Sequence, residues 1–222
     1  MLPQILKQNT FPEALVKYIA NLDIPKISGD AFCLFTEIYT EENFITLITK
    51  DFIYALFDGF DLITMESDLN SLVKLITMLN WIEQLNKFVL EVFSTHKNSR
   101  KLVDYLLFIL NKEKDDKKSI FKICKLISDL LEITKSSLFY KNDLDSFMSI
   151  SIHTLETTYT DELRFHFLNI LNKILKFKDY FESKYKLDIL EEILENYKVS
   201  DNVDDENKKL CDQILESIEK NK

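Results

Sequence analysis

Turn-forming residues are scarce in this sequence, since only two of its 222 residues are glycine and three are proline. Sheet proteins and nucleotide-binding folds need many tight turns, which usually contain these two residue types. The sequence also has no glycine-rich loop that could hold a phosphate group. Leu, Ile and Phe dominate the apolar residues instead. The composition therefore predicts an all-α protein.

Cysteine and histidine are also rare, with three residues of each type. Cys33, Cys124 and Cys211 form no CxxC pair and fit a reducing compartment. The histidines are far apart in the chain and fit surface or edge positions, without the converging Cys, Asp or Glu side chains that zinc sites and nucleophilic triads need. We therefore expect a protein that is not an enzyme and that holds no metal ion and no cofactor.

Long apolar runs are missing too. No run approaches the ~20 residues of a membrane-spanning helix, and the N-terminus has no signal-peptide core. The net charge is −9 at pH 7, and residues 188–219 carry eleven acidic side chains against three lysines. Because nucleic-acid affinity depends on neutralising phosphates, an acidic chain without a basic groove suits it poorly. We expect a cytoplasmic protein with no membrane span and no nucleic-acid partner.

What the sequence does contain is apolar residues at helical spacing along almost its whole length. From residue 68 onward, every second helix begins roughly 30 to 45 residues after the last, close to the period of HEAT-type helix pairs. Such pairs bury their apolar faces by stacking. The sequence thus predicts one armadillo/HEAT-like domain over residues 1–222, a right-handed helical solenoid, with a globular helical bundle as the alternative. The expected helices, about twelve, are 12–21, 31–39, 40–48, 52–57, 68–80, 84–94, 99–111, 120–134, 144–157, 161–178, 186–196 and 206–220, with a possible short helix at 1–8.

The expected helix 161–178 shows this organisation best. Its apolar arc covers about half of the circumference, wider than the ~100° stripe of a helix that packs on one side only. We therefore expect neighbours on more than one side, with Thr160 as the N-cap. A polar stripe lies opposite the apolar arc and includes one aromatic residue, Phe165. The stripe consists of Phe165, Asn169, Asn172, Lys173 and Lys176.

Three further features allow specific expectations. Residues 112–118 (KEKDDKK) have the composition of a solvated linker, and Trp81 is interpreted as a core residue. Leu187, Leu190 and Leu194 are spaced 3 and 4 residues apart and should be buried, with Ile193 beside them and acidic residues opposite. The helix 206–220 should cap the stack with its acidic outer face in solvent. Its expected apolar stripe is Leu210, Ile214, Leu215 and Ile218.

The section from Leu138 to Asn196 resembles a known family. FYKNDLDSFMSISI, DELRFHFL and KFKDYFESKYKLDILEEILEN follow one another in the order and spacing of the C-terminal leucine-rich armadillo domain of the WISH/DIP family. The vertebrate member of that family is the NCK-interacting protein with an SH3 domain. Residues 86–116 are similar in spacing. The chain has fewer N-terminal helices than the family's domain usually has, and no Src-homology-3 or proline-rich region.

This resemblance implies a function. Members of the family activate the actin-related protein 2/3 complex without a pre-existing mother filament, so that it seeds linear actin filaments. The expected partners are that complex and actin, within the actin cytoskeleton. The alternative is a generic armadillo/HEAT adaptor that binds a peptide or a partner helix. The candidate partner-binding residues are Phe165, Asn169, Lys173 and Lys176 of the polar stripe, with Arg164 and Tyr180, which match the family motif.

Overall fold

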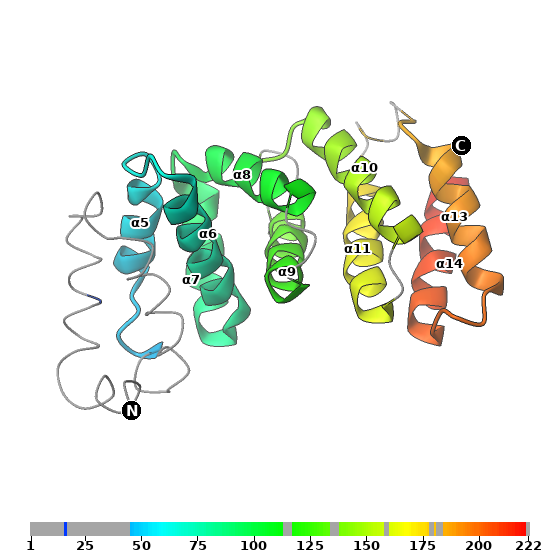
Figure 1. Ribbon diagram of the computed structural model, residues 1–222, viewed down its shortest axis with the longest axis horizontal. Helices are drawn as coiled ribbons and strands as arrows, with labels where there is room; N and C mark the ends of the chain where they lie inside the picture. The colour runs from blue at the N-terminus through cyan, green and yellow to red at the C-terminus, as the bar shows by residue number, and fades with distance from the viewer. Residues whose placement is uncertain are drawn as a thin grey trace. The chain divides into compact units, whose positions relative to one another are not determined.

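The computed structural model of the chain describes residues 16, 45–112, 117–133, 138–157, 160–177, 180 and 184–220, and the ordered elements in these ranges are helices (Figure 1). Nine helices lie in this part of the chain, so the expected number of about twelve is not shown. The expected helices 1–8 and 31–39, all of 12–21 except residue 16, and most of 40–48 lie outside the described residues. The chain divides into two compact units, Met1–Leu102 and Val103–Lys222, and a single domain over 1–222 stays a prediction.

The first unit contains α5 (Lys50–Gly59), α6 (Glu66–Trp81) and α7 (Glu83–Thr95). Helix α7 packs against both α5 and α6. The rings of Phe57 and Phe93 meet edge to face across the α5–α7 contact, with centroids 4.7 Å apart. Helix α5 begins at Lys50 because the Thr49 hydroxyl accepts a hydrogen bond from the Phe52 N–H at 3.2 Å. This N-cap places the break before Lys50, two residues earlier than the start expected from the sequence.

Trp81 is not a core residue. Its side chain is 45 % exposed, whereas Leu72, Leu75, Ile76 and Leu79 of α6 are buried. Those four residues follow the spacing of one helix face, and Trp81 comes two residues after Leu79, about 200° around the helix axis. The interpretation of Trp81 from its apolar neighbours was therefore wrong, because the buried face of α6 has turned away before the helix ends.

His96, which follows α7, is buried rather than on the surface or at an edge. Its Nδ1 accepts a hydrogen bond from the Asn98 backbone N–H at 3.1 Å, and its Nε2 lies 3.2 Å from Asp58 Oδ1. Since Nδ1 is an acceptor, the proton of the neutral ring is on Nε2, which donates to Asp58. The Asn98 side chain donates to the Phe57 carbonyl oxygen at 2.9 Å. These contacts satisfy polar groups at the end of α5 and fix the turn before α8.

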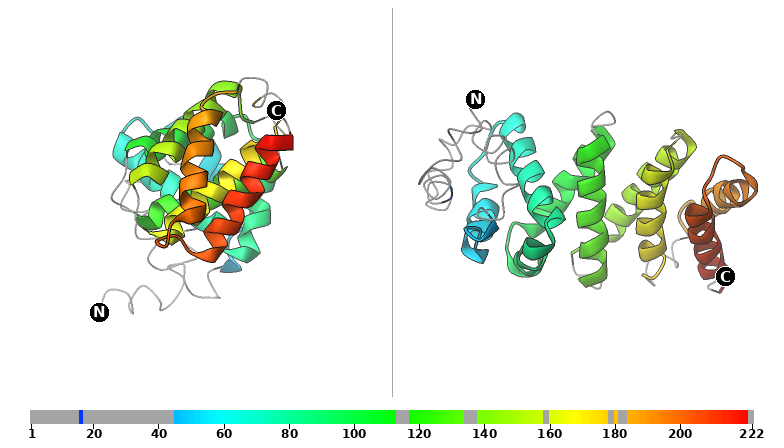
Figure 2. Two further views of the ribbon diagram at one scale, coloured as in Figure 1. Left: turned by 90° about the vertical axis from the view of Figure 1, so that its right-hand side faces the viewer. Right: turned by 90° about the horizontal axis from the view of Figure 1, so that it is seen from below.

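The second unit is organised around α11. Helix α8 (Ser99–Lys112) begins in the first unit and continues into the second, which also holds α9 (Lys117–Ile133), α10 (Lys141–Thr157), α11 (Asp161–Ile174), α13 (Leu187–Val199) and α14 (Asp205–Lys220). Helix α11 packs against α9, α10 and α14, and Figure 2 shows it between α9 and α14. Helix α13 packs against α10 and α14. The expectation that the wide apolar arc of α11 serves several neighbours is confirmed.

Three helix ends in this unit differ from the expected ones, and local hydrogen bonds account for two of them. Lys117 and Lys118 begin α9, so only part of the expected linker 112–118 can be a loop. Helix α10 starts three residues early, because the Asp143 carboxylate accepts the Tyr140 backbone N–H at 2.6 Å, as the third residue of a capping box does. Helix α11 ends at Ile174 rather than at 178, since Phe177 N–H bonds to the Ile174 carbonyl in a tighter turn.

The last two helices confirm most of what the sequence predicts for them. Leu187, Leu190 and Leu194 are buried, and Asp188, Glu192 and Glu195 are exposed. The acidic side chains of α14 also face solvent, as expected for its outer surface. The expected apolar stripe of α14 was wrong in part, because Leu210 and Leu215 are only half-buried. The buried face of α14 consists of Asn207, Cys211, Ile214 and Ile218.

No helix in the described ranges is long and apolar enough to cross a membrane.

Candidate functional site

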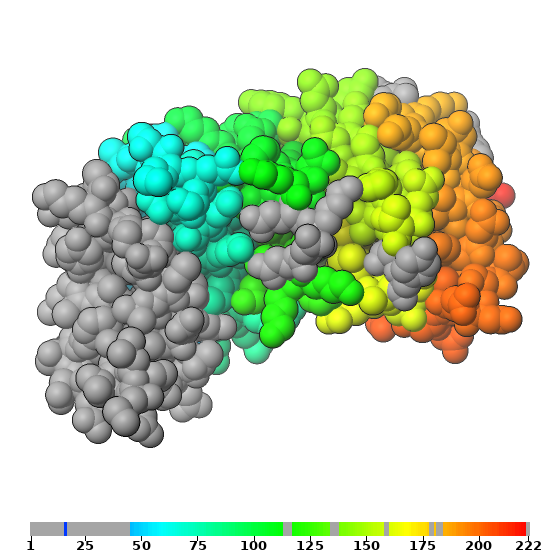
Figure 3. All heavy atoms as spheres, in the orientation of Figure 1, coloured from blue at the N-terminus to red at the C-terminus, as the bar shows by residue number. Residues whose placement is uncertain are grey.

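Two adjoining cavities lie along α10 in the second unit and form a candidate binding site. Their volumes are about 390 and 660 Å³. They share Asn111 of α8 and Ser149 and Ile150 of α10, and we call the pair the α10 groove. The smaller part is the apolar cavity and the larger part is the acidic cavity, named after their linings. Figure 3 shows α10 and α13 side by side on one face of this unit.

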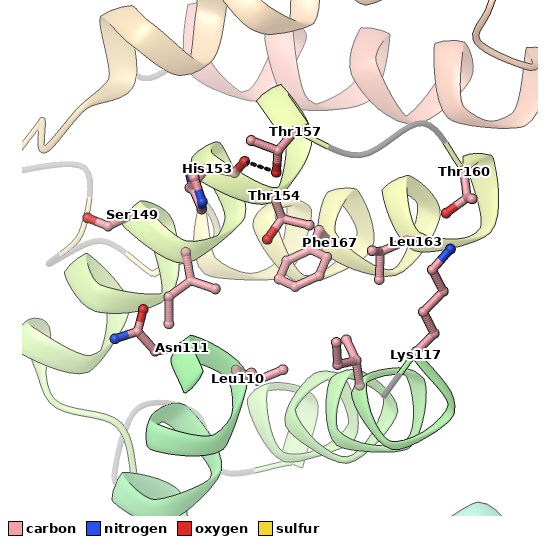
Figure 4. A pocket seen from close by; sticks show the side chains of 12 residues that line it. Leu110, Asn111, Lys117, Ser149, His153, Thr154, Thr157, Thr160, Leu163 and Phe167 are labelled. Carbon is pink, nitrogen blue, oxygen red and sulfur yellow. Dashed lines mark hydrogen bonds between the residues drawn. The ribbon is translucent and has the colours of Figure 1, made fainter. Parts of the chain in front are cut away.

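The apolar cavity has a floor of buried side chains from three helices. Leu110 comes from α8, Ile120 from α9, and Leu163 and Phe167 from α11. In Figure 4 Phe167 and Leu163 project from α11 into the cavity, facing Leu110. An apolar group placed on this floor would gain roughly 25 cal/mol for each Å² removed from water.

The rim of the apolar cavity is polar. His153, Thr154 and Thr157 of α10 line it, together with Lys117 of α9 and Thr160. In Figure 4 the Lys117 side chain extends toward Thr160. Thr160 is the N-cap of α11 by its backbone, as expected, but its side chain makes no capping hydrogen bond and its buried Oγ1 has no partner. The rim therefore offers donors and acceptors around an apolar floor, the usual composition of a ligand site.

The acidic cavity contains carboxylates and aromatic rings. Asp104 of α8 and Asp143 and Asp145 of α10 line it, and none of its described lining residues is basic. Asp143 is occupied in capping α10, whereas the buried Oδ1 of Asp145 has no hydrogen-bond partner. Phe108, 44 % exposed, and Tyr185, 36 % exposed, supply the aromatic surface.

Tyr185 is held in place by an unusual turn before α13. The residues on either side of it, Lys184 and Lys186, have φ angles of 50° and 52°, the left-handed region that costs a residue with a Cβ about 1 kcal/mol or more. The buried Tyr180 hydroxyl donates to the Tyr185 carbonyl oxygen at 2.6 Å. The Tyr185 hydroxyl lies 3.0 Å from Ser149 Oγ, and Lys186 Nζ donates to Ser149 Oγ at 3.1 Å. These bonds fix the Tyr185 ring against α10.

Two of the residues suggested from the sequence, Arg164 and Tyr180, are buried and support the fold. The Arg164 guanidinium donates to Asp161 Oδ1 at 2.8 Å and to the Asn202 carbonyl oxygen at 2.9 Å, and it lies 5.2 Å from the centre of the Tyr197 ring. Burial alone would lower the pKa of Arg164, but its bonds to Asp161 and Tyr197 outweigh that effect and raise it. Burial also raises the pKa of Tyr180, which stays protonated as a donor.

The other four residues suggested from the sequence lie on the α9 side of α11. Asn169 Nδ2 approaches Ser128 Oγ at 3.4 Å, and Lys173 Nζ donates to the Ser128 carbonyl oxygen at 3.1 Å and to Glu132 at 2.9 Å. The Lys173 side chain is therefore only 19 % exposed. Phe165 is half-buried beside the His166 ring, and Lys176 is exposed. Much of the polar stripe thus joins two helices, and its role in partner binding stays a prediction.

The sequence did not reveal the residues of the α10 groove as a group. Asp145 and Phe108 lie on helices that the sequence predicts, but which cavity they line depends on how α8 and α10 pack. The conformation of Tyr185 depends on two lysines in a backbone region that lysine rarely adopts, and no residue pattern indicates this. Within the described residues, no three His, Cys, Asp or Glu side chains come together as a metal site would require.

Comparison with known proteins gives one family and several structures. A family model described as the SPIN90/Ldb17 leucine-rich domain matches residues 53–190, more than half of the chain. No curated protein matches. An engineered protein whose crystal structure was solved by the Northeast Structural Genomics Consortium is 14 % identical, with a TM-score of 0.46, and the match covers 99 % of this chain and 96 % of that chain. A designed armadillo repeat protein is 13 % identical, with a TM-score of 0.44, covering 98 % of this chain and all of its own. Likeness at TM-scores below 0.5 does not establish a shared fold or function.

Proposed function

The chain belongs to the SPIN90/Ldb17 leucine-rich domain family, and from this premise we propose that it is a non-enzymatic activator of the actin-related protein 2/3 complex. In this role it seeds linear actin filaments without a mother filament. The observation that carries the proposal is the family match. Its range, residues 53–190, includes every residue that lines the α10 groove. The proposed partners are the complex and actin, and the proposed location is the actin cytoskeleton of the cytoplasm.

The proposed mechanism is a shift between two states of the complex. A ligand moves a conformational equilibrium only if it binds one state better than the other. To move the complex from 1 % to 99 % active, the chain would have to bind the active arrangement about 10⁴-fold more tightly, roughly 5.5 kcal/mol. Binding surfaces fixed before contact lose less entropy on association, and the Tyr185 turn is fixed by three hydrogen bonds. No nucleotide bound to this chain takes part in this mechanism.

Two surfaces of the second unit are proposed to contact the complex. One is the α10 groove. The other is the polar stripe of α11, of which Lys176 is exposed and Phe165 half-buried, while Arg164 and Tyr180 would act by holding the adjoining helices in place. The right-handed armadillo/HEAT-like solenoid also belongs to the proposal, since stacking of α9, α11 and α14 is what such a solenoid would use.

The second candidate function, a generic adaptor for a peptide or a partner helix, is favoured by the groove itself. An apolar floor beside a polar rim would suit either kind of segment. The two functions differ in their effect on actin. An activator accelerates polymerisation of actin in the presence of the purified complex alone, whereas an adaptor binds without accelerating it.

The test is an actin polymerisation assay with purified complex, purified chain and no other activator. The proposal expects acceleration that requires both components, and unbranched filaments when single filaments are imaged. No acceleration at micromolar chain, together with binding of an unrelated peptide in the groove, would favour the adaptor.

A further inference from the structure

We propose that the acidic cavity of the α10 groove receives a basic side chain, preferably arginine, from a partner segment that lies along α10. This inference rests on the proposed function and adds the chemistry of the partner to it. The partner segment would place its basic residue between Asp104 and Asp145 and an apolar residue over Phe167 in the apolar cavity.

Charge is the first reason. Three carboxylates line the acidic cavity, and no basic residue is found among its described lining. One of the three, Asp143, accepts the Tyr140 N–H and caps α10, whereas the buried Oδ1 of Asp145 has no hydrogen-bond partner. Lys186, a nearby cation before α13, donates to Ser149. A donor that reaches Asp145 Oδ1 would satisfy this buried acceptor.

Aromatic surface is the second reason. Phe108 and Tyr185 both line the acidic cavity and are partly exposed. Both rings already attract cations of this chain, since Lys112 Nζ lies 5.3 Å from the Phe108 ring centre and Lys186 Nζ lies 5.4 Å from that of Tyr185. A guanidinium group combines flat stacking on rings with a fork of donors for carboxylates, so it suits this lining better than an ammonium group does.

The length of the groove fits a short segment. Asn142 and Thr157 mark its two ends on α10, and fifteen residues of helix span about 22 Å. A helix of about four turns, or about seven residues of extended chain, covers that length. In a helical partner the basic residue and the apolar residue would therefore lie about two to three turns apart.

The first arm of the test needs no partner protein. Acetyl-arginine methylamide and its neutral counterpart of similar shape, acetyl-citrulline methylamide, are titrated into the full-length chain and followed by NMR. The inference expects the arginine compound to bind at least fivefold more tightly, with shifts at Phe108, Asp145 and Tyr185. The paired substitution Asp104→Asn and Asp145→Asn should remove this preference. Glu219→Gln, an exposed change on α14, should keep it.

The second arm measures binding to the purified complex. The paired Asp104→Asn and Asp145→Asn variant should bind at least tenfold more weakly than the wild type, while its thermal stability and that of the Glu219→Gln variant stay unchanged. A complex that fails to bind the wild type refutes the proposed function, and the NMR arm then still decides whether the cavity takes a cation.

Each of the following results would overturn the inference. The two small compounds bind equally well, or the paired variant retains the preference for arginine, or it binds the complex as tightly as the wild type does. A sedimentation measurement in which the wild type is dimeric and the paired variant monomeric would assign the groove to a second copy of the chain instead, and would equally overturn it.

Discussion

Substitution of Leu190 by alanine tests whether α13 packs as described. Leu190 is fully buried in α13, which lies against α10 and α14, so its truncation leaves a cavity between three helices. Leu→Ala changes in such positions cost about 2–5 kcal/mol, from lost burial and from the unfilled space. For a chain of this size the midpoint of thermal unfolding should fall by about 4–20 °C.

The neighbouring residue supplies a matched control. Ile189 lies on the same helix, one residue away, and is 39 % exposed. Ile189→Ala should change the free energy of unfolding by less than about 0.5 kcal/mol, as ordinary surface substitutions do. Both variants are measured by urea unfolding followed by far-UV circular dichroism, with the slope checked for a constant value. A loss below about 0.5 kcal/mol for Leu190→Ala, or equal losses for both variants, would refute the assignment of the buried face.

Four further outcomes are expected. Arg164→Ala should destabilise the chain by about 3 kcal/mol, which is the lower end of the range for breaking a buried ion pair, because Asp161 is partly exposed. A change below about 0.5 kcal/mol in urea unfolding would contradict this. Burial raises the pKa of Cys211 to about 12, so only about one thiol in 10⁴ is ionised at pH 8. Mass spectrometry should therefore find Cys211 unlabelled after iodoacetamide treatment of the native chain, and rapid labelling would show that the thiol is accessible. Phe165→Ala and Lys176→Glu should each weaken binding to the complex at least tenfold while thermal stability is retained. Unchanged binding in both variants would remove the polar stripe from the interface, and a stability loss for Phe165→Ala alone would assign that residue to the core. Deletion of Asp205–Lys220 should lower the midpoint of thermal unfolding, since it uncovers α11 and α13, and an unchanged midpoint would mean that α14 is not a cap.

The sequence predicted the described helices to within three or four residues, because their apolar residues recur at helical spacing. The ends that differ depend on single local bonds. Thr49 starts α5, and Asp143 starts α10 by bonding back to Tyr140. Both patterns are visible in the sequence, but only the structure shows which of several possible caps is used.

The face of each helix could be predicted where polar and apolar residues alternate clearly, and less well elsewhere. In α13 three leucines are buried and Asp188, Glu192 and Glu195 are exposed, as predicted, whereas Glu191 is half-buried. In α14 the buried face includes Asn207, whose side chain donates to the Asp161 carbonyl oxygen at 3.0 Å. A buried polar residue of this kind cannot be recognised from spacing alone, because its partner lies on another helix, 46 positions earlier in the chain.

The candidate site could be predicted least of all. Contacts along a helix follow from its sequence, whereas the α10 groove is formed by α8, α9, α10 and α11 together with the turn that carries Tyr185. The two residues chosen from the family motif, Arg164 and Tyr180, support the fold instead. Both are buried and form hydrogen bonds within the fold, and structural residues of this type give a family its recognisable motif as readily as binding residues do.

The central claim is that this chain alone switches on the actin-related protein 2/3 complex. The most direct measurement is single-filament imaging of actin with the purified complex and the purified chain, without a preformed filament or any other activator. The account predicts new linear filaments whose number rises with the concentration of the chain and falls to the background rate when the complex is left out. Filament numbers that do not change with micromolar chain, or filaments that appear only as branches on older ones, would contradict it.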